Sequence, residues 1–128
     1  MAEPRWLSRL VVDAVHFDQL REHGGHRGIR DEKALESALA RARSRREYAR
    51  SSDLARLAAA YGIGIVTSHP YRNGNKRIGF LAMVIFLGLN GKRFSAPESD
   101  VVTTMVALAD RRLSEDQLAE WLRGYIVT

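Results

Sequence analysis

The chain has 128 residues, which is enough for one domain with a single hydrophobic core and too few for a separate nucleotide-binding domain. Its 20 Lys and Arg residues exceed its 15 Asp and Glu residues, so the net charge is +5 and the surface favours an anionic partner: a nucleotide, a nucleic acid or an acidic protein. The sequence has no cysteine, which excludes a disulfide framework, a thiolate nucleophile and a cysteine-based zinc site.

Two features of the sequence argue against export or membrane insertion. Residues 1–9 lack the apolar run of a signal peptide. The longest apolar stretch, Ile78–Leu89, spans 12 residues, whereas a membrane-crossing helix needs about 20. We therefore expect a cytoplasmic protein without a membrane partner, in which this stretch is a buried core helix.

The first half of the chain predicts three helices. Ser8 is expected to cap the first, which carries Leu10, Ala14 and Phe17 on one face and stops at Gly24-Gly25. Asp31 is expected to cap the second. The apolar stripe from Leu54 to Ile65 predicts a third helix running toward Thr67, in which Gly62 and Gly64 permit close packing; a strand is the competing interpretation of this stretch.

The second half predicts three more helices. His69-Pro70 begins a loop, after which the long apolar helix runs to Asn90-Gly91, and residues 92–95 form a short extended piece. One helix follows Pro97, and the capping-box pattern Ser114–Gln117 announces the last. The sequence thus predicts an all-α fold, a bundle of about six helices in a single domain over residues 1–128.

The loop His69–Arg77, with the sequence HPYRNGNKR, concentrates chemistry at the start of the most hydrophobic helix. Free backbone N–H groups and the positive end of the helix dipole favour an anion there, and Gly74 lets a phosphate approach the backbone. His69 can accept a proton from a hydroxyl group near neutral pH. Asn73 offers an oxygen ligand for Mg²⁺ beside a nucleotide.

This loop resembles the motif of the Doc branch of the Fic family, H-x-F-x-(D/N)-(A/G)-N-K-R, at every position but one, where Tyr71 replaces phenylalanine. Tyrosine can fill the same pocket if its hydroxyl finds a partner. The resemblance extends to the upstream segments 28–39 and 53–61, and so covers nearly the whole chain.

The resemblance implies a compact Fic/Doc-type helical bundle with at most a short extended flap, for which residues 24–30 are the candidate. It implies that His69 activates a target hydroxyl and that Asn73 holds Mg²⁺. It also implies that the residues following Asn73 bind the phosphates of ATP: Gly74, Asn75, Lys76 and Arg77.

The resemblance also implies the reaction. Fic enzymes that transfer AMP follow the pattern H-x-F-x-(D/E)-G-N-G-R-x-x-R, whereas this sequence has Lys76 in place of the second glycine and Phe80 in place of the second arginine. Doc toxins are kinases that phosphorylate a threonine of elongation factor Tu and so block translation. A toxin of this type II toxin-antitoxin class would be paired with a Phd-like antitoxin. AMP transfer and a catalytically weak or inactive binding module remain the alternatives.

Other patterns favour structural interpretations. The arginine-rich stretch from Arg41 to Arg50 is interpreted first as a solvated face, then as a docking site for an acidic antitoxin segment, and last as a nucleic-acid site. His16, His23 and His26 are expected at the surface rather than around a metal ion.

Overall fold

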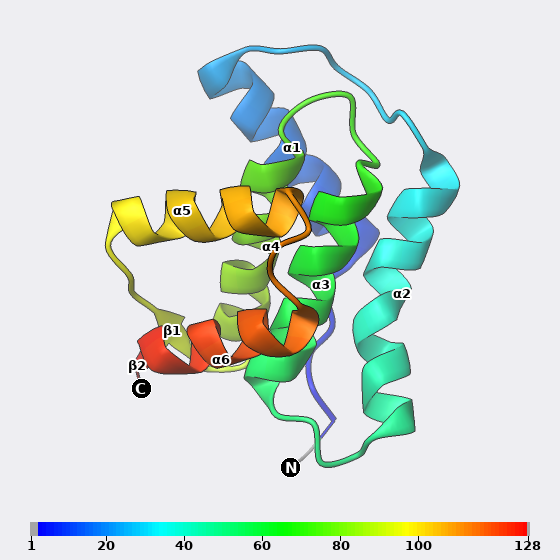
Figure 1. Ribbon diagram of the computed structural model, residues 1–128. Coiled ribbons are helices and arrows are strands. Elements are labelled where there is room, and N and C mark those ends of the chain that lie inside the picture. The colour runs from blue at the N-terminus through cyan, green and yellow to red at the C-terminus, as the bar shows by residue number, and fades with distance from the viewer. Residues whose placement is uncertain (1–2, 128) are drawn as a thin grey trace.

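The computed structural model describes residues 3–127; Met1, Ala2 and Thr128, which belong to the expected domain, lie outside the described residues. It contains six α-helices and one pair of very short strands within that range (Figure 1). The helices are α1 (Arg9–His23), α2 (Glu32–Tyr48), α3 (Leu54–Ser68), α4 (Asn75–Leu89), α5 (Glu98–Ala109) and α6 (Glu115–Tyr125). The all-α prediction is therefore confirmed.

Local capping chemistry determines where most of the helices begin. The side chains of Ser8 and Asp31 accept hydrogen bonds from the first turns of α1 and α2. Asp53 does the same for α3. At α6, Ser114 and Gln117 form the capping box that the sequence predicts, each bonding the backbone N–H of the other.

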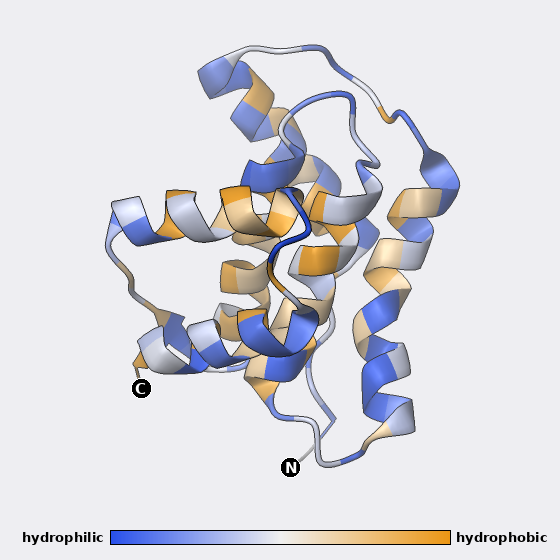
Figure 2. Ribbon diagram, in the orientation of Figure 1, coloured by the Kyte–Doolittle hydropathy of each residue, from blue (hydrophilic) through white to orange (hydrophobic). Residues whose placement is uncertain are grey.

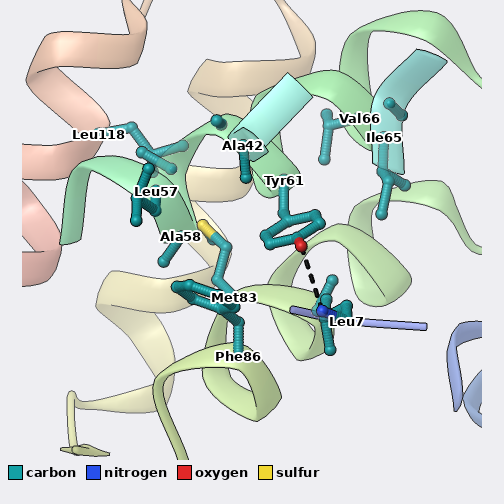
Figure 3. Close-up of a cluster of buried hydrophobic side chains, with 14 of the residues drawn as sticks. Leu7, Ala42, Leu57, Ala58, Tyr61, Ile65, Val66, Met83, Phe86 and Leu118 are labelled. Atoms are coloured by element: carbon teal, nitrogen blue, oxygen red, sulfur yellow. Dashed lines mark hydrogen bonds between the residues drawn. The ribbon is translucent and has the colours of Figure 1, made fainter. Parts of the chain in front are cut away.

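The central helix of the bundle is α3, which packs against α2, α4 and α6. Hydrophobic residues gather along α3 and α4, whereas the connecting loops are hydrophilic (Figure 2). Tyr61 is fully buried in this core, where its ring lies 5.1 Å from that of Phe86 and its hydroxyl accepts a hydrogen bond from the Leu7 amide at 3.1 Å (Figure 3). The core therefore also fixes the segment that leads into α1.

Glycines allow α3 to approach its neighbours closely, as the sequence predicts. A Cβ atom at Gly62 would lie 2.4 Å from the sulfur of Met83, and one at Gly64 would lie 3.2 Å from the Cα of Ala38. On α4, a Cβ at Gly79 would lie 2.5 Å from Cγ2 of Val66. Residues 54–68 are a helix, so the competing strand interpretation is wrong.

The extended piece expected at residues 92–95 is present as β1 (Arg93–Phe94). It pairs antiparallel with β2 (Ile126–Val127), which the sequence analysis did not predict. The apolar residues that share one face of α1 lie outward: Leu10 is 80% exposed and Phe17 is 52% exposed, while Val12 and His16 are the buried residues of this helix.

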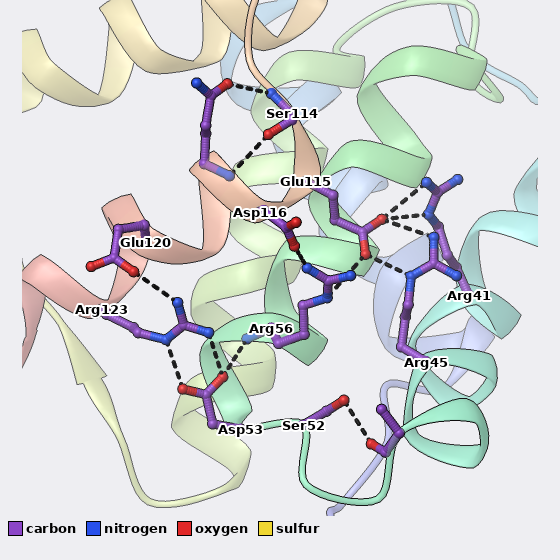
Figure 4. A network of polar contacts seen from close by, with 12 residues as sticks. Arg41, Arg45, Ser52, Asp53, Arg56, Ser114, Glu115, Asp116, Glu120 and Arg123 are labelled. Carbon is purple, nitrogen blue, oxygen red and sulfur yellow. Dashed lines mark hydrogen bonds and ion pairs between the residues drawn. The ribbon is translucent and has the colours of Figure 1, made fainter.

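Most of the arginine-rich stretch lies in α2, with Arg50 beyond its end, and the interpretation of it as a solvated face is wrong for Arg41 and Arg45. Arg41 and Arg45 bind the carboxylate of Glu115 on α6, and Arg56 of α3 bridges Glu115 and Asp116 (Figure 4). Burial alone would raise the pKa of Glu115, but the hydrogen bonds from Arg45 and Arg41 outweigh it and lower that pKa. These arginines therefore tie α2 and α3 to α6.

No helix within residues 3–127 has both the length and the apolar character that crossing a lipid bilayer requires.

Candidate active site

The loop that joins α3 to α4 is closed by hydrogen bonds of the side chain of Asn75, the first residue of α4. The side chain of Asn75 is buried, accepts a hydrogen bond from the Tyr71 amide at 3.0 Å and donates one to the Tyr71 carbonyl at 2.9 Å. Both polar atoms of this side chain are thus used to fold the loop. A phosphate at this position would contact the backbone N–H of Asn75 rather than its side chain.

The start of α4 has free hydrogen-bond donors. Gly74 is its N-cap, with a left-handed φ of 82° that favours glycine, and it provides no side-chain cap. The first amide of α4 with a hydrogen bond is that of Ile78, which donates to the Gly74 carbonyl at 2.8 Å. The amides of residues 75–77 have no acceptor within the described chain. Together with the helix dipole, these amides form an anion-binding position.

Lys76 and Arg77 add positive charge to this position. Both side chains are exposed, and neither forms an ion pair with another residue in the range 3–127. They line a pocket of about 560 Å³ together with apolar side chains of α4 and α5. The remaining lining residues are Gln19, Phe80, Leu81, Ala96, Glu98, Val101, Val102, Met105 and Val106.

His69 lies at the opposite end of the loop, as the residue that ends α3. Its backbone is left-handed, with φ 50° and ψ 57°, and its N–H donates to the Ile65 carbonyl at 3.2 Å. The residue is exposed, and its imidazole has no hydrogen-bond partner among the described residues. The ring is therefore accessible to a hydroxyl group from another molecule.

Asn73 lies against the segment that precedes α2. Its Oδ1 accepts a hydrogen bond from the His26 amide at 2.5 Å, and its Nδ2 donates to the Arg72 carbonyl at 2.8 Å. A carboxamide oxygen has two lone pairs, so one remains for another ligand. The structure thus places the expected metal ligand in the loop, but with part of its bonding capacity already in use.

Side chains of α1 pack against the loop and bond to it. The Tyr71 ring stacks on that of His16 with 3.8 Å between centroids, and its hydroxyl donates to Asp13 at 3.1 Å. The tyrosine that replaces phenylalanine in the motif therefore has the hydroxyl partner that it needs. The Nε2 of His16 donates to the Asn73 carbonyl at 3.2 Å.

His16 is 6% exposed, so the expectation that it lies at the surface is wrong. Burial lowers its pKa, although the hydrogen bond to Asn73 and the charge of Asp13 act in the opposite direction. Burial also raises the pKa of Tyr71, and Asp13 adds to this effect. The neutral forms of both rings are thus favoured beneath the loop.

The segment between α1 and α2 runs beside the loop and is bonded to it (Figure 1). Ile29 forms an antiparallel bridge with Tyr71, and the Arg72 amide donates to the Gly28 carbonyl at 3.3 Å. The candidate flap, residues 24–30, therefore contacts the loop from His26 to Arg30.

Sequence reasoning missed the residues that support the loop from elsewhere in the chain. Arg30 donates to the carbonyls of Ser68 and His69, and Asp13 and His16 hold Tyr71 and Asn73. Each contact joins residues at least 38 positions apart. The signal that the sequence did offer is that His16 follows the apolar Val12 by four residues, a spacing that puts both on one face of a helix.

The arrangement suits one kind of chemistry. An anion is attracted to the start of α4, and an accessible imidazole at the other end of a short loop can accept a proton. A hydroxyl group that attacks a phosphate ester needs both.

Comparison with known protein families gives a match over most of the chain. The family model described as "Fic/DOC family" matches residues 6–87, close to two thirds of the chain, including all of the loop and helices α1 to α3. No curated protein matches the chain.

Proposed function

The chain belongs to the Fic/DOC family, and we propose that it is a cytoplasmic toxin that transfers the γ-phosphate of ATP to a threonine hydroxyl of a protein, elongation factor Tu, and so blocks translation. Members of the family are typically transferases that act on proteins. The observation that carries the proposal is the uncapped start of α4, where Lys76 and Arg77 lie without ion-pair partners in the described chain, one short loop away from the exposed His69.

In the proposed reaction, His69 accepts the proton of the target hydroxyl while the oxygen of that hydroxyl attacks the γ-phosphorus of ATP. The bond between that phosphorus and the oxygen bridging to the β-phosphate breaks, and ADP leaves. The N–H groups of Asn75, Lys76 and Arg77 and the two cationic side chains stabilise the negative charge of the phosphoryl group in the transition state. Gly74 leaves open space beside them, since a Cβ there would have no atom within 4 Å.

Magnesium is expected with the nucleotide. Mg²⁺ usually keeps several waters and takes one or two protein oxygens together with substrate phosphates. Within residues 3–127 no group of three or more His, Cys, Asp or Glu side chains is arranged to hold a metal. Asn73 fits as a single ligand through the lone pair that His26 leaves open. When bound, the ion would neutralise charge on the phosphates.

Two residues favour phosphate transfer over AMP transfer. Lys76 stands where the AMP-transferring pattern has glycine, and Phe80 stands where it has arginine; both line the pocket at the start of α4. A second arginine is therefore replaced by an apolar ring. AMP transfer remains the alternative reaction.

The same pocket is the candidate docking surface for a Phd-like antitoxin. Apart from Lys76, Arg77, Gln19 and Glu98 its wall is apolar, and it includes Val102 and Val106, which are 56% and 40% exposed. An amphipathic helix with an acidic end would bury these side chains and pair with the two cations.

The experiment that tests the proposed function is transfer of label from ATP to purified elongation factor Tu. With γ-labelled ATP the protein labels its target, and His69→Ala lowers the rate by about 100-fold or more, because a general base contributes this much. Arg77→Ala lowers it as well.

The control is α-labelled ATP, which leaves the target unlabelled. Label from α-labelled ATP would support AMP transfer instead. Undiminished γ-label transfer by His69→Ala or Arg77→Ala would contradict the mechanism.

A further inference from the structure

Two arginines hold the C-terminal end of α3. The last carbonyl groups of a helix have no partner within the helix and attract cationic donors. Arg30 donates from Nε to the His69 carbonyl at 2.7 Å and from Nη2 to the Ser68 carbonyl at 2.9 Å. Arg111 donates from Nη2 to the Thr67 carbonyl at 3.1 Å.

The backbone at Arg30 bonds the same segment of the chain. The amides of Arg30 and Asp31 both donate to the Pro70 carbonyl, at 2.7 and 3.1 Å. Residue 30 therefore binds three consecutive carbonyls, those of Ser68, His69 and Pro70. The Ser68 and His69 carbonyls belong to the peptide bonds on either side of His69.

His69 needs this support because its backbone is left-handed. A residue with a Cβ rarely adopts that conformation, and it persists only where surrounding contacts impose it. The imidazole has no hydrogen bond of its own within the described residues. Its location is therefore determined through the backbone, and Arg30 is the side chain that bonds the carbonyl of that residue.

We infer that Arg30 is a positioning residue, which holds His69 in the left-handed conformation that places its imidazole for proton transfer. The inference rests on the proposed function for the role of His69. The planar guanidinium suits the task because it donates to two neighbouring carbonyls at once in a fixed geometry, which an ammonium group on a flexible stem does not reproduce.

The matched comparison is Arg111. It bonds the Thr67 carbonyl of the same helix end, but within the described residues it has no hydrogen bond to His69. Arg30→Met and Arg111→Met each remove one guanidinium from the end of α3, and both variants are expected to lower the melting temperature by a few degrees. Only Arg30→Met releases the backbone of His69.

The kinetic test uses the full chain, ATP and elongation factor Tu. In Arg30→Met we expect kcat to fall by about 100-fold, the size of effect that a misplaced catalytic group produces, with the KM for ATP within about twofold of wild type. Arg111→Met is expected to keep kcat within about twofold. Arg30→Lys keeps the positive charge and serves as the second variant if Arg30→Met fails to fold. It is expected to recover only part of the lost kcat.

A second readout does not depend on activity. The backbone amide and Cα chemical shifts of His69 report its left-handed conformation; they are expected to change in Arg30→Met and to stay at their wild-type values in Arg111→Met. Unchanged His69 shifts, or equal losses of kcat in the two methionine variants, would overturn the role of Arg30. If wild type transfers no phosphate but the shifts behave as expected, the proposed function fails and the positioning of His69 stands.

Discussion

His16 shows how one buried residue connects α1 with the active-site loop. Its ring lies beneath that of Tyr71, and its Nε2 donates to the carbonyl of Asn73. Because the side chain is removed from water, its pKa in the folded protein is lower than the ordinary value of 6.5. The folded protein therefore resists protonation at this site more than the unfolded chain does.

The lowered pKa of His16 makes the stability of the protein depend on pH. Below pH 6.5 the unfolded chain takes up a proton at this position before the folded protein does, so the stability contributed at higher pH is lost as the pH falls. The free energy of unfolding of wild type should fall between pH 7 and pH 5 more steeply than that of His16→Gln. Urea denaturation at several pH values measures this, and equal slopes for the two proteins would contradict it.

Asn75 and Asn73 illustrate that a motif residue can serve structure as well as ligand binding. The side chain of Asn75 is bonded on both polar atoms to the backbone of Tyr71, which closes the loop between His69 and the start of α4. Asn73 is bonded to the segment before α2. The sequence motif predicted where these residues lie, but the division of their hydrogen bonds depends on neighbours that the motif does not contain.

At the scale of elements, the contact between α3 and α4 sets the geometry of the site, since α3 has His69 as its C-cap and α4 has Gly74 as its N-cap. The two helices approach closely at Gly79, where a Cβ would lie 2.5 Å from the branched side chain of Val66 and 3.2 Å from the Gly62 carbonyl oxygen. Neither neighbour is the flexible end of a long side chain.

Gly79→Ala should therefore destabilise the protein. Overpacking costs about 1–3 kcal/mol, and the better helix propensity of alanine offsets up to about 1 kcal/mol, so we expect a net loss of about 1–2 kcal/mol. The matched control is Gly88→Ala on the same helix, where a Cβ would have no atom within 4 Å; it should be neutral or stabilising by up to about 1 kcal/mol. Thermal or urea denaturation compares them. A Gly79→Ala protein as stable as wild type would show that the helices can separate.

The elements that the sequence predicted are those specified by local chemistry. Helix boundaries of this kind depend on only a few neighbouring residues. The sequence therefore identified the helices that begin after Ser8, Asp31 and Ser114 and the one that ends before Gly24. The strand β2 was missed because two residues carry too little pattern to identify a strand.

Orientation within the fold could not be predicted in the same way. Leu10, Ala14 and Phe17 share one face of α1, yet the buried face carries Val12 and His16. Both faces have helical spacing, and only packing against α4 and the loop decides between them. Likewise Arg30 contacts residues that follow it by 38 and 39 positions, a pairing that no local pattern encodes.

At the scale of the whole molecule, two groups of cationic side chains differ in whether they have acidic partners. Toward α6, Arg41, Arg45 and Arg56 are paired with Glu115, so part of the cluster that could have indicated a nucleic-acid site instead holds helices together. At the start of α4, Lys76 and Arg77 are exposed and have no acidic partner in the described chain. The positive charges of Lys76 and Arg77 are thus available to an anionic ligand at the proposed site.

The most direct measurement is a titration of the isotope-labelled protein with ATP and Mg²⁺, followed through its backbone amide NMR signals. Saturable shifts of the Gly74, Asn75, Lys76 and Arg77 amides are expected, because these N–H groups would bind the phosphates. The double variant Lys76→Ala, Arg77→Ala should require a much higher ATP concentration. Saturable shifts confined to other parts of the chain, or no saturable shift at all, would contradict a nucleotide site at the start of α4.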